Sequence, residues 1–129
     1  MRHAYVDASA LAKLVLAEPG SAEMQRWYIE NDKVLCSRIG IVETRRAVGR
    51  HLHDPVHLDL VLRSVDVIEF DVEIARRAAS IGPPSMKTLD AIHLASAVQV
   101  GPAIGAFVTY DDRLADAARL VGLPVVRPA

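Results

Sequence analysis

Short apolar runs alternate with longer amphipathic stretches along the whole chain, and this alternation constrains the possible fold more than any other feature. The short runs have the length of strands, and the stretches between them have the periodicity of helices. Such alternation is typical of βαβ units, in which helices cover both faces of a parallel sheet. The sequence predicts a single domain over residues 1–129, a three-layer α/β/α fold with a central parallel sheet of about five strands.

Local signals set the expected element boundaries. Strands are expected over residues 4–6, 33–37, 66–70, 106–110 and 124–127, and helices over 9–18, 21–30, 39–52, 56–64, 72–81, 88–100 and 111–121. Pro19-Gly20 and Gly101-Pro102 are expected to end helices, because proline and glycine interrupt helical patterns. Ser37 and Thr88 are expected to cap helix N-termini.

The composition indicates the cellular compartment of the protein but does not indicate its binding partner. The 15 basic and 16 acidic residues nearly balance, so net charge points to no binding partner. No apolar run approaches the roughly 18 residues of a membrane span, and Asp7 interrupts the N-terminal stretch where a signal peptide needs an apolar core. Cys36 is the only cysteine, which excludes an internal disulfide. We therefore expect a cytoplasmic protein with no membrane partner.

Four acidic residues stand at strand ends or in the first turns of helices. Asp7 ends the first strand, Glu43 lies early in a helix, Asp90 lies in a first turn, and Asp111 follows the fourth strand. In a parallel sheet these positions share one edge, where ligands bind. Each acid alone has another explanation, since carboxylates near helix N-termini stabilise the helix by typically 0.3–1 kcal/mol.

Four carboxylates at one edge repel one another unless their pKa values shift or a cation binds. An all-oxygen site suits Mg²⁺ or Mn²⁺ better than Zn²⁺, which prefers histidine and cysteine. His93, one turn after Asp90, is expected to pack or support the site rather than bind metal. A carboxylate-held Mg²⁺ is suited to phosphoryl transfer, so the pattern predicts a nuclease or another phosphohydrolase.

Three arginines are candidates for binding the substrate. Arg46 and Arg50 follow Glu43 by three and seven residues, which places them on its helix face, and Arg113 stands close to Asp111. They could bind phosphates flanking a cut, or they could pair with surface acids and with the site carboxylates. The sequence leaves both alternatives open.

Four blocks, "YVDASALAKL", "ETRRA", "LDAIHLASA" and "FVTYDDRLADAA", together resemble the PIN domain, and within it the VapC-like toxin ribonucleases of bacterial type II toxin-antitoxin operons. The resemblance spans nearly the whole chain. It implies that Asp7, Glu43, Asp90 and Asp111 are the catalytic acids and hold one or two Mg²⁺ or Mn²⁺ ions. Asp112 is a second candidate for the last position, and Asp111 is favoured because it directly follows Thr-Tyr at the strand end.

The resemblance carries further implications. Ser9 and Thr109 match hydroxyl positions that support the acids or a water on the metal. Proteins of this group cleave single-stranded or looped RNA, usually as homodimers, and a small antitoxin typically blocks the site. The stretch 52–65 is short for a family that often places a longer helical clip there, so dimer or antitoxin contacts can differ in this chain.

Other functions agree less well with the residues. A haloacid-dehalogenase-like phosphatase usually opens with two aspartates two positions apart, where this chain has Asp7 and Ser9, and a receiver domain needs a lysine where Arg127 stands. A third alternative is a catalytically weak module that keeps the fold and only binds RNA or a partner. The presence of all four acids favours the nuclease over this module.

Overall fold

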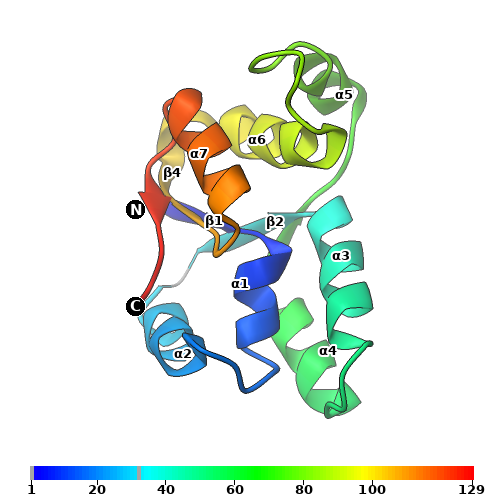
Figure 1. Ribbon diagram of the computed structural model, residues 1–129, viewed down its shortest axis with the longest axis vertical. Coiled ribbons are helices and arrows are strands. Elements are labelled where there is room, and N and C mark those ends of the chain that lie inside the picture. Colours follow the sequence, from blue (N-terminus) through cyan, green and yellow to red (C-terminus); the bar gives the residue numbers. More distant parts are fainter. Residues whose placement is uncertain (1, 32) are drawn as a thin grey trace.

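The computed structural model describes residues 2–31 and 33–129, and these form a parallel sheet covered by helices on both faces (Figure 1). Within this part of the chain the sheet has five strands in the order β3-β2-β1-β4-β5, and every neighbouring pair is parallel. The predicted α/β fold is confirmed. The strands are β1 (His3–Val6), β2 (Val34–Ser37), β3 (Asp66–Ile68), β4 (Ile104–Val108) and β5 (Val125–Val126).

Helices α6 and α7 lie on one side of the sheet, and α1 to α4 lie on the other (Figure 1). Of the helices that the structure describes, none combines the length and the apolar character needed to cross a membrane. The helices are α1 (Ala8–Lys13), α2 (Ser21–Ile29), α3 (Arg38–Val48), α4 (Pro55–Arg63), α5 (Val72–Ala78), α6 (Thr88–Val100) and α7 (Asp112–Leu120), with a 3₁₀ turn at Gly101–Ala103.

Strand β1 separates two apolar cores. Its alternate side chains point to opposite faces, so Tyr5 packs with Phe107 and Leu94 under α6 and α7, while Val6 packs with Leu11 in the core under α1 to α4. Tyr5 and Val6 are both fully buried. The central strand is therefore covered on both faces.

The strand order places a topological switch point beside β1. The chain runs from β1 outward through β2 and β3, and then returns to β4 on the other side of β1. In such sheets ligands bind at the carboxyl ends of the two strands that flank the switch. Here those ends carry Asp7 after β1 and Thr109 to Asp111 after β4.

Several predicted boundaries and one predicted cap differ from the structure. Helix α1 ends at Lys13, because the amides of Leu14 and Val15 bond to carbonyls three residues back and tighten the last turn. Ser37 is the N-cap of α3 as predicted, with its hydroxyl accepting from the Gly40 amide at 2.9 Å. The Thr88 cap is wrong: Thr88 is already helical, and Lys87 is the N-cap without a side-chain bond.

Candidate active site

Asp7 is the buried centre of the candidate site. It follows β1 and caps the N-terminus of α1, with only 4% of the residue exposed. Its Oδ1 atom accepts hydrogen bonds from the Ala10 amide at 3.0 Å and the Ser9 hydroxyl at 2.7 Å, and its Oδ2 atom accepts from the Thr109 hydroxyl at 2.6 Å. This carboxylate therefore has one fixed orientation, because the end of β1, the start of α1 and two hydroxyl groups hold it.

Burial raises the pKa of Asp7 above its ordinary value, and the hydrogen bonds from Thr109, Ser9 and Ala10 oppose this rise without cancelling it. Desolvation penalises a charged carboxylate unless a cation or enough donors compensate. Within the described residues, no lysine or arginine forms an ion pair with Asp7. An ionised Asp7 would thus gain from a cation placed at its surface.

The end of β4 is tied to Asp7 through two hydroxyl groups. Thr109 is fully buried, and its hydroxyl donates to Asp7 and accepts from the Asp111 amide at 3.0 Å. The Ser9 hydroxyl in turn accepts from the Tyr110 amide at 2.8 Å. The two strand ends at the switch point are therefore locked together, as the predicted supporting role of Ser9 and Thr109 requires.

Asp111 and Asp112 have different surroundings. Asp111 caps α7, with its Oδ1 atom accepting from the Leu114 amide at 3.1 Å, and its backbone is bonded to the Thr109 hydroxyl at the site. The Asp112 side chain is 88% exposed and pairs with Arg127 at 2.7 Å. This geometry favours Asp111 as the fourth acid, although its cap bond already uses one carboxylate oxygen.

Asp90 lies in the first turn of α6, and its carboxylate pairs with Arg113 of α7 at 3.1 Å. The Asp90 side chain is 10% exposed, whereas 59% of the Arg113 side chain is exposed. Arg113 therefore pairs with a site acid in this structure, which is one of the two alternatives that the sequence left open for it. Its exposed surface can still meet a phosphate.

Glu43 projects from α3 and meets His93 of α6, with Glu43 Oε1 and His93 Nε2 2.6 Å apart. The other imidazole nitrogen, Nδ1, lies 2.6 Å from the Tyr5 hydroxyl. His93 is 3% exposed and Tyr5 is fully buried. The supporting role expected of His93 agrees with these contacts. Tyr5 was not expected in the site, because in the sequence it looks like any core aromatic residue of a strand.

Arg46 and Arg50 line a hollow of about 670 Å³ between α1 and α3, which also contains Glu43 and Ser9. No carboxylate among the described residues pairs with either arginine, whereas the neighbouring Arg45 pairs with Asp59 at 3.1 Å. The hollow thus joins an acid of the candidate site to two guanidinium groups that are available to an anion.

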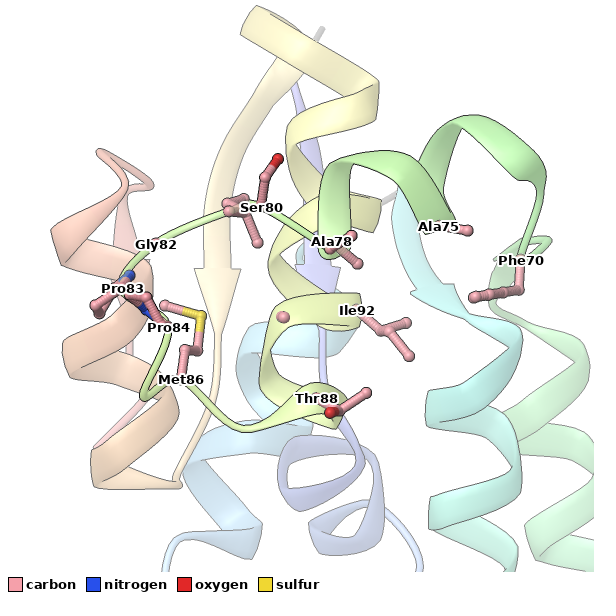
Figure 2. A pocket seen from close by; sticks show the side chains of 13 residues that line it. Phe70, Ala75, Ala78, Ser80, Gly82, Pro83, Pro84, Met86, Thr88 and Ile92 are labelled. Carbon is pink, nitrogen blue, oxygen red and sulfur yellow. The ribbon is translucent and has the colours of Figure 1, made fainter.

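Another hollow, of about 460 Å³, is lined by residues of α5, of the loop between α5 and α6, and of α6. Figure 2 shows Pro84 and Met86 of the loop before α6 on one side of it, and Phe70 and Ile92 on the other. Its lining includes none of the four acids. This hollow is therefore separate from the candidate site.

The chemistry of the donor set fits a hard divalent cation, because carboxylate and hydroxyl oxygens are the ligands that Mg²⁺ and Mn²⁺ prefer. The acids are nevertheless not assembled for binding: across residues 2–31 and 33–129, no three histidine, cysteine or acidic side chains form a group that could hold a metal. Asp90 is turned to Arg113 and Glu43 to His93. The assignment of the acids as ligands stays a prediction.

Comparison with known proteins places this geometry in a family. The model of the PIN domain matches residues 4–120. Ribonuclease VapC47 of Mycobacterium tuberculosis is 35% identical over 131 residues, which cover 96% of each chain. Ribonuclease VapC46 of the same species is 33% identical, with 97% of each chain covered. These matches extend over nearly the whole sequence.

Solved structures agree with the fold. The chain is similar to Mycobacterium tuberculosis VapC20, described as a Sarcin-Ricin loop cleaving toxin, with a TM-score of 0.73 and 19% identity over 96% of this chain and 98% of that one. A chain of a toxin-antitoxin complex from Klebsiella pneumoniae gives a TM-score of 0.69 and 20% identity over 98% of each chain. The family model, the near full-length relatives and the shared fold together establish that this chain belongs to the PIN domain family.

Proposed function

We propose that the protein is a metal-dependent endoribonuclease that hydrolyses RNA phosphodiester bonds and acts as the toxin of a toxin-antitoxin pair. The observation that carries the proposal is the buried Asp7 carboxylate at the switch point, fixed by Ser9 and Thr109 and lacking a cationic side-chain partner among the described residues. Curated relatives named ribonuclease VapC, 33–35% identical over nearly the full length, support the activity.

The four acids at this edge of the sheet would act together as ligands of one or two cations. Asp7, Glu43, Asp90 and Asp111 would hold Mg²⁺, for which Mn²⁺ can substitute, and the PIN ribonuclease family generally depends on divalent metals. The bound cation would lower the pKa of water and offset charge on the phosphodiester. Ser9 and Thr109 keep Asp7 oriented, and a carboxylate oxygen that faces away from the cation would accept the proton of the attacking water.

A catalytically weak RNA- or partner-binding PIN module is the second candidate. The ion pair between Asp90 and Arg113 favours it, because it commits a site acid to a group of the protein itself. The two candidates differ in one observable, since only the nuclease cuts RNA and needs a cation to do so.

Partners follow from the same proposal. A cognate antitoxin would cover the site, and a toxin-antitoxin complex among the similar structures supports this assignment. We also propose a homodimer, and a cytoplasmic location where RNA is available and the single Cys36 needs no disulfide partner.

Total RNA incubated with the purified protein tests the proposed function. We expect discrete cuts in Mg²⁺ or Mn²⁺ and none in EDTA, and sequencing of the cut ends would give the target. Intact RNA in both conditions, from a folded protein, would leave the binding module as the better description.

Divalent cations should also stabilise the fold. A ligand that binds only the native state at 100 times its dissociation constant stabilises it by about 2.7 kcal/mol, so millimolar Mn²⁺ should raise the melting temperature. Thermal melts would be compared with a monovalent salt of equal ionic strength, which should have no such effect. Identical melting curves would count against a metal site.

The two unpaired guanidinium groups give a prediction for RNA binding. The double variant Arg46→Ala with Arg50→Ala should weaken binding of single-stranded RNA. It should also reduce the magnitude of the negative slope of log K against log salt by about 1.4, because each lost phosphate contact contributes about 0.7. Arg45→Ala is the matched control, since Arg45 lies on the same helix but pairs with Asp59. Equal effects of the double variant and the control would reject the proposed contacts.

A further inference from the structure

A chain of three hydrogen bonds connects the buried core to Glu43. The Ser37 amide donates to the Tyr5 hydroxyl at 3.2 Å, the Tyr5 hydroxyl contacts His93 Nδ1 at 2.6 Å, and His93 Nε2 contacts Glu43 Oε1 at 2.6 Å. Ser37 is also the N-cap of α3, the helix that carries Glu43. This chain of hydrogen bonds therefore begins at the N-cap of α3, passes through β1 and α6, and ends on α3.

The number of available protons determines the tautomer of His93. The Tyr5 oxygen already accepts from the Ser37 amide, so its single proton is free to bond to Nδ1 of His93. A nitrogen that accepts carries no proton, which places the proton of the neutral imidazole on Nε2, facing Glu43. The opposite tautomer would turn a nitrogen lone pair toward the carboxylate and leave the Tyr5 proton without its acceptor.

We propose that Tyr5 and His93 are positioning residues of the active site: Tyr5 holds the His93 imidazole through Nδ1, and His93 thereby holds one oxygen of Glu43 so that the other faces the hollow between α1 and α3. This inference rests on the proposed nuclease function. It adds to that function two residues which do not touch the substrate and which no motif of acids identifies.

The arrangement is more than a surface glutamate needs. The Glu43 side chain is 32% exposed and lines the hollow between α1 and α3, so water alone could solvate it. It nevertheless receives a hydrogen bond from an imidazole that is 4% exposed. Two buried polar groups, those of Tyr5 and His93, are thus devoted to orienting one carboxylate at the edge of the sheet. Gly40 leaves room for the imidazole, because a Cβ there would lie 3.2 Å from His93 Cε1.

Nitrogen-15 NMR of the histidine side chains tests the inference without reference to activity. In the metal-free protein the His93 signal, identified by its loss in His93→Gln, should show a proton on Nε2 and a free Nδ1. Tyr5→Phe removes only the hydroxyl, so Nδ1 of His93 loses its hydrogen-bond donor and its signal should shift, while the Nε2 proton stays opposite the Glu43 carboxylate. Tyr28→Phe is the matched control, because the Tyr28 hydroxyl bonds to Ser64 and not to His93, and it should leave the His93 signal unchanged.

Kinetics supply the second measurement. Tyr5→Phe should lower kcat for RNA cleavage by about 10- to 100-fold, the usual effect of losing a group that orients a ligand, with KM nearly unchanged. His93→Gln interrupts the hydrogen-bonded path from Tyr5 to Glu43, so this variant should also lower kcat, and adding Tyr5→Phe to it should cost little more.

Two results would overturn the inference: a His93 Nδ1 signal that does not change in Tyr5→Phe, or a kcat loss from Tyr5→Phe that is equally large with His93→Gln present. The proposed function fails differently. If the wild-type protein does not cut RNA in Mn²⁺, the nuclease assignment is lost, while the Nδ1 signal of His93 in Tyr5→Phe still decides whether Tyr5 holds the imidazole that contacts Glu43.

Discussion

Replacement of Asp7 by asparagine is expected to reduce RNA cleavage by about a thousandfold and, in the same molecule, to raise the stability of the metal-free protein. The loss of activity corresponds to about 4 kcal/mol of transition-state stabilisation, the several kcal/mol that a correctly held cation supplies. The gain in stability follows from burial, which makes the charged form of Asp7 unfavourable in the folded state. We expect a gain of about 1 kcal/mol at neutral pH, as for other strained functional residues.

The pH dependence of this effect has a definite sign. Burial raises the pKa of Asp7 in the folded protein, so its contribution to stability is complete at pH values below the unfolded pKa and is lost as the pH rises through the folded pKa. Asparagine does not titrate. The difference in melting temperature between Asp7→Asn and wild type in EDTA should therefore be largest at neutral pH and should shrink as the solution is acidified.

Asp116→Asn is the matched control for Asp7→Asn. Its carboxylate is 81% exposed and pairs only with Arg119 on the same helix, so it should change neither cleavage nor the dependence of stability on pH. An Asp7→Asn protein that cuts RNA at the wild-type rate would refute the catalytic assignment. If the variant is instead less stable than wild type at neutral pH, the hydrogen bonds from Ser9 and Thr109 outweigh the burial of the charge.

The layers of the fold could be predicted because buried parallel strands leave short apolar runs in the sequence. The end of each helix could not, since a helix stops where local backbone bonds compete best. Leu14 and Val15 tighten the last turn of α1, and at the start of α6 the backbone of Lys87, not the hydroxyl of Thr88, occupies the cap position. Such outcomes depend on differences of about 1 kcal/mol that residue type alone does not fix.

Contacts within the candidate site depend on packing between distant segments. The position of Asp7 at a strand end is visible in the sequence, but its bond with Thr109 spans 102 residues and depends on the register that pairs Val6 with Val108. The pairing of Asp90 with Arg113 likewise depends on how α6 meets α7. Sequence reasoning could name both alternatives for the arginine and had no means to choose between them.

Gly40→Ala should destabilise the protein by about 1–3 kcal/mol, although helix propensity alone predicts a gain of about 1 kcal/mol. Gly40 lies in the first turn of α3. A Cβ at this position would lie 2.3 Å from Cys36 Sγ and 3.2 Å from His93 Cε1, and Cys36 is fully buried. Urea unfolding would measure the change, and a variant more stable than wild type would show that the packing is looser than the structure indicates.

Pairing Gly40→Ala with Cys36→Ala separates its two contacts. Removal of the thiol leaves room for the added methyl group, so the double variant should be more stable than the sum of the single effects predicts, as expected for residues in direct contact. The contact with His93 remains in the double variant, because the imidazole still lies 3.2 Å from the new Cβ. Gly40→Ala should also lower RNA cleavage, because the new Cβ presses on the imidazole that holds Glu43. In the double variant stability should therefore recover while RNA cleavage stays reduced. Recovery of both together would mean that Gly40 serves only the packing of Cys36, and that the imidazole tolerates the methyl group without releasing Glu43.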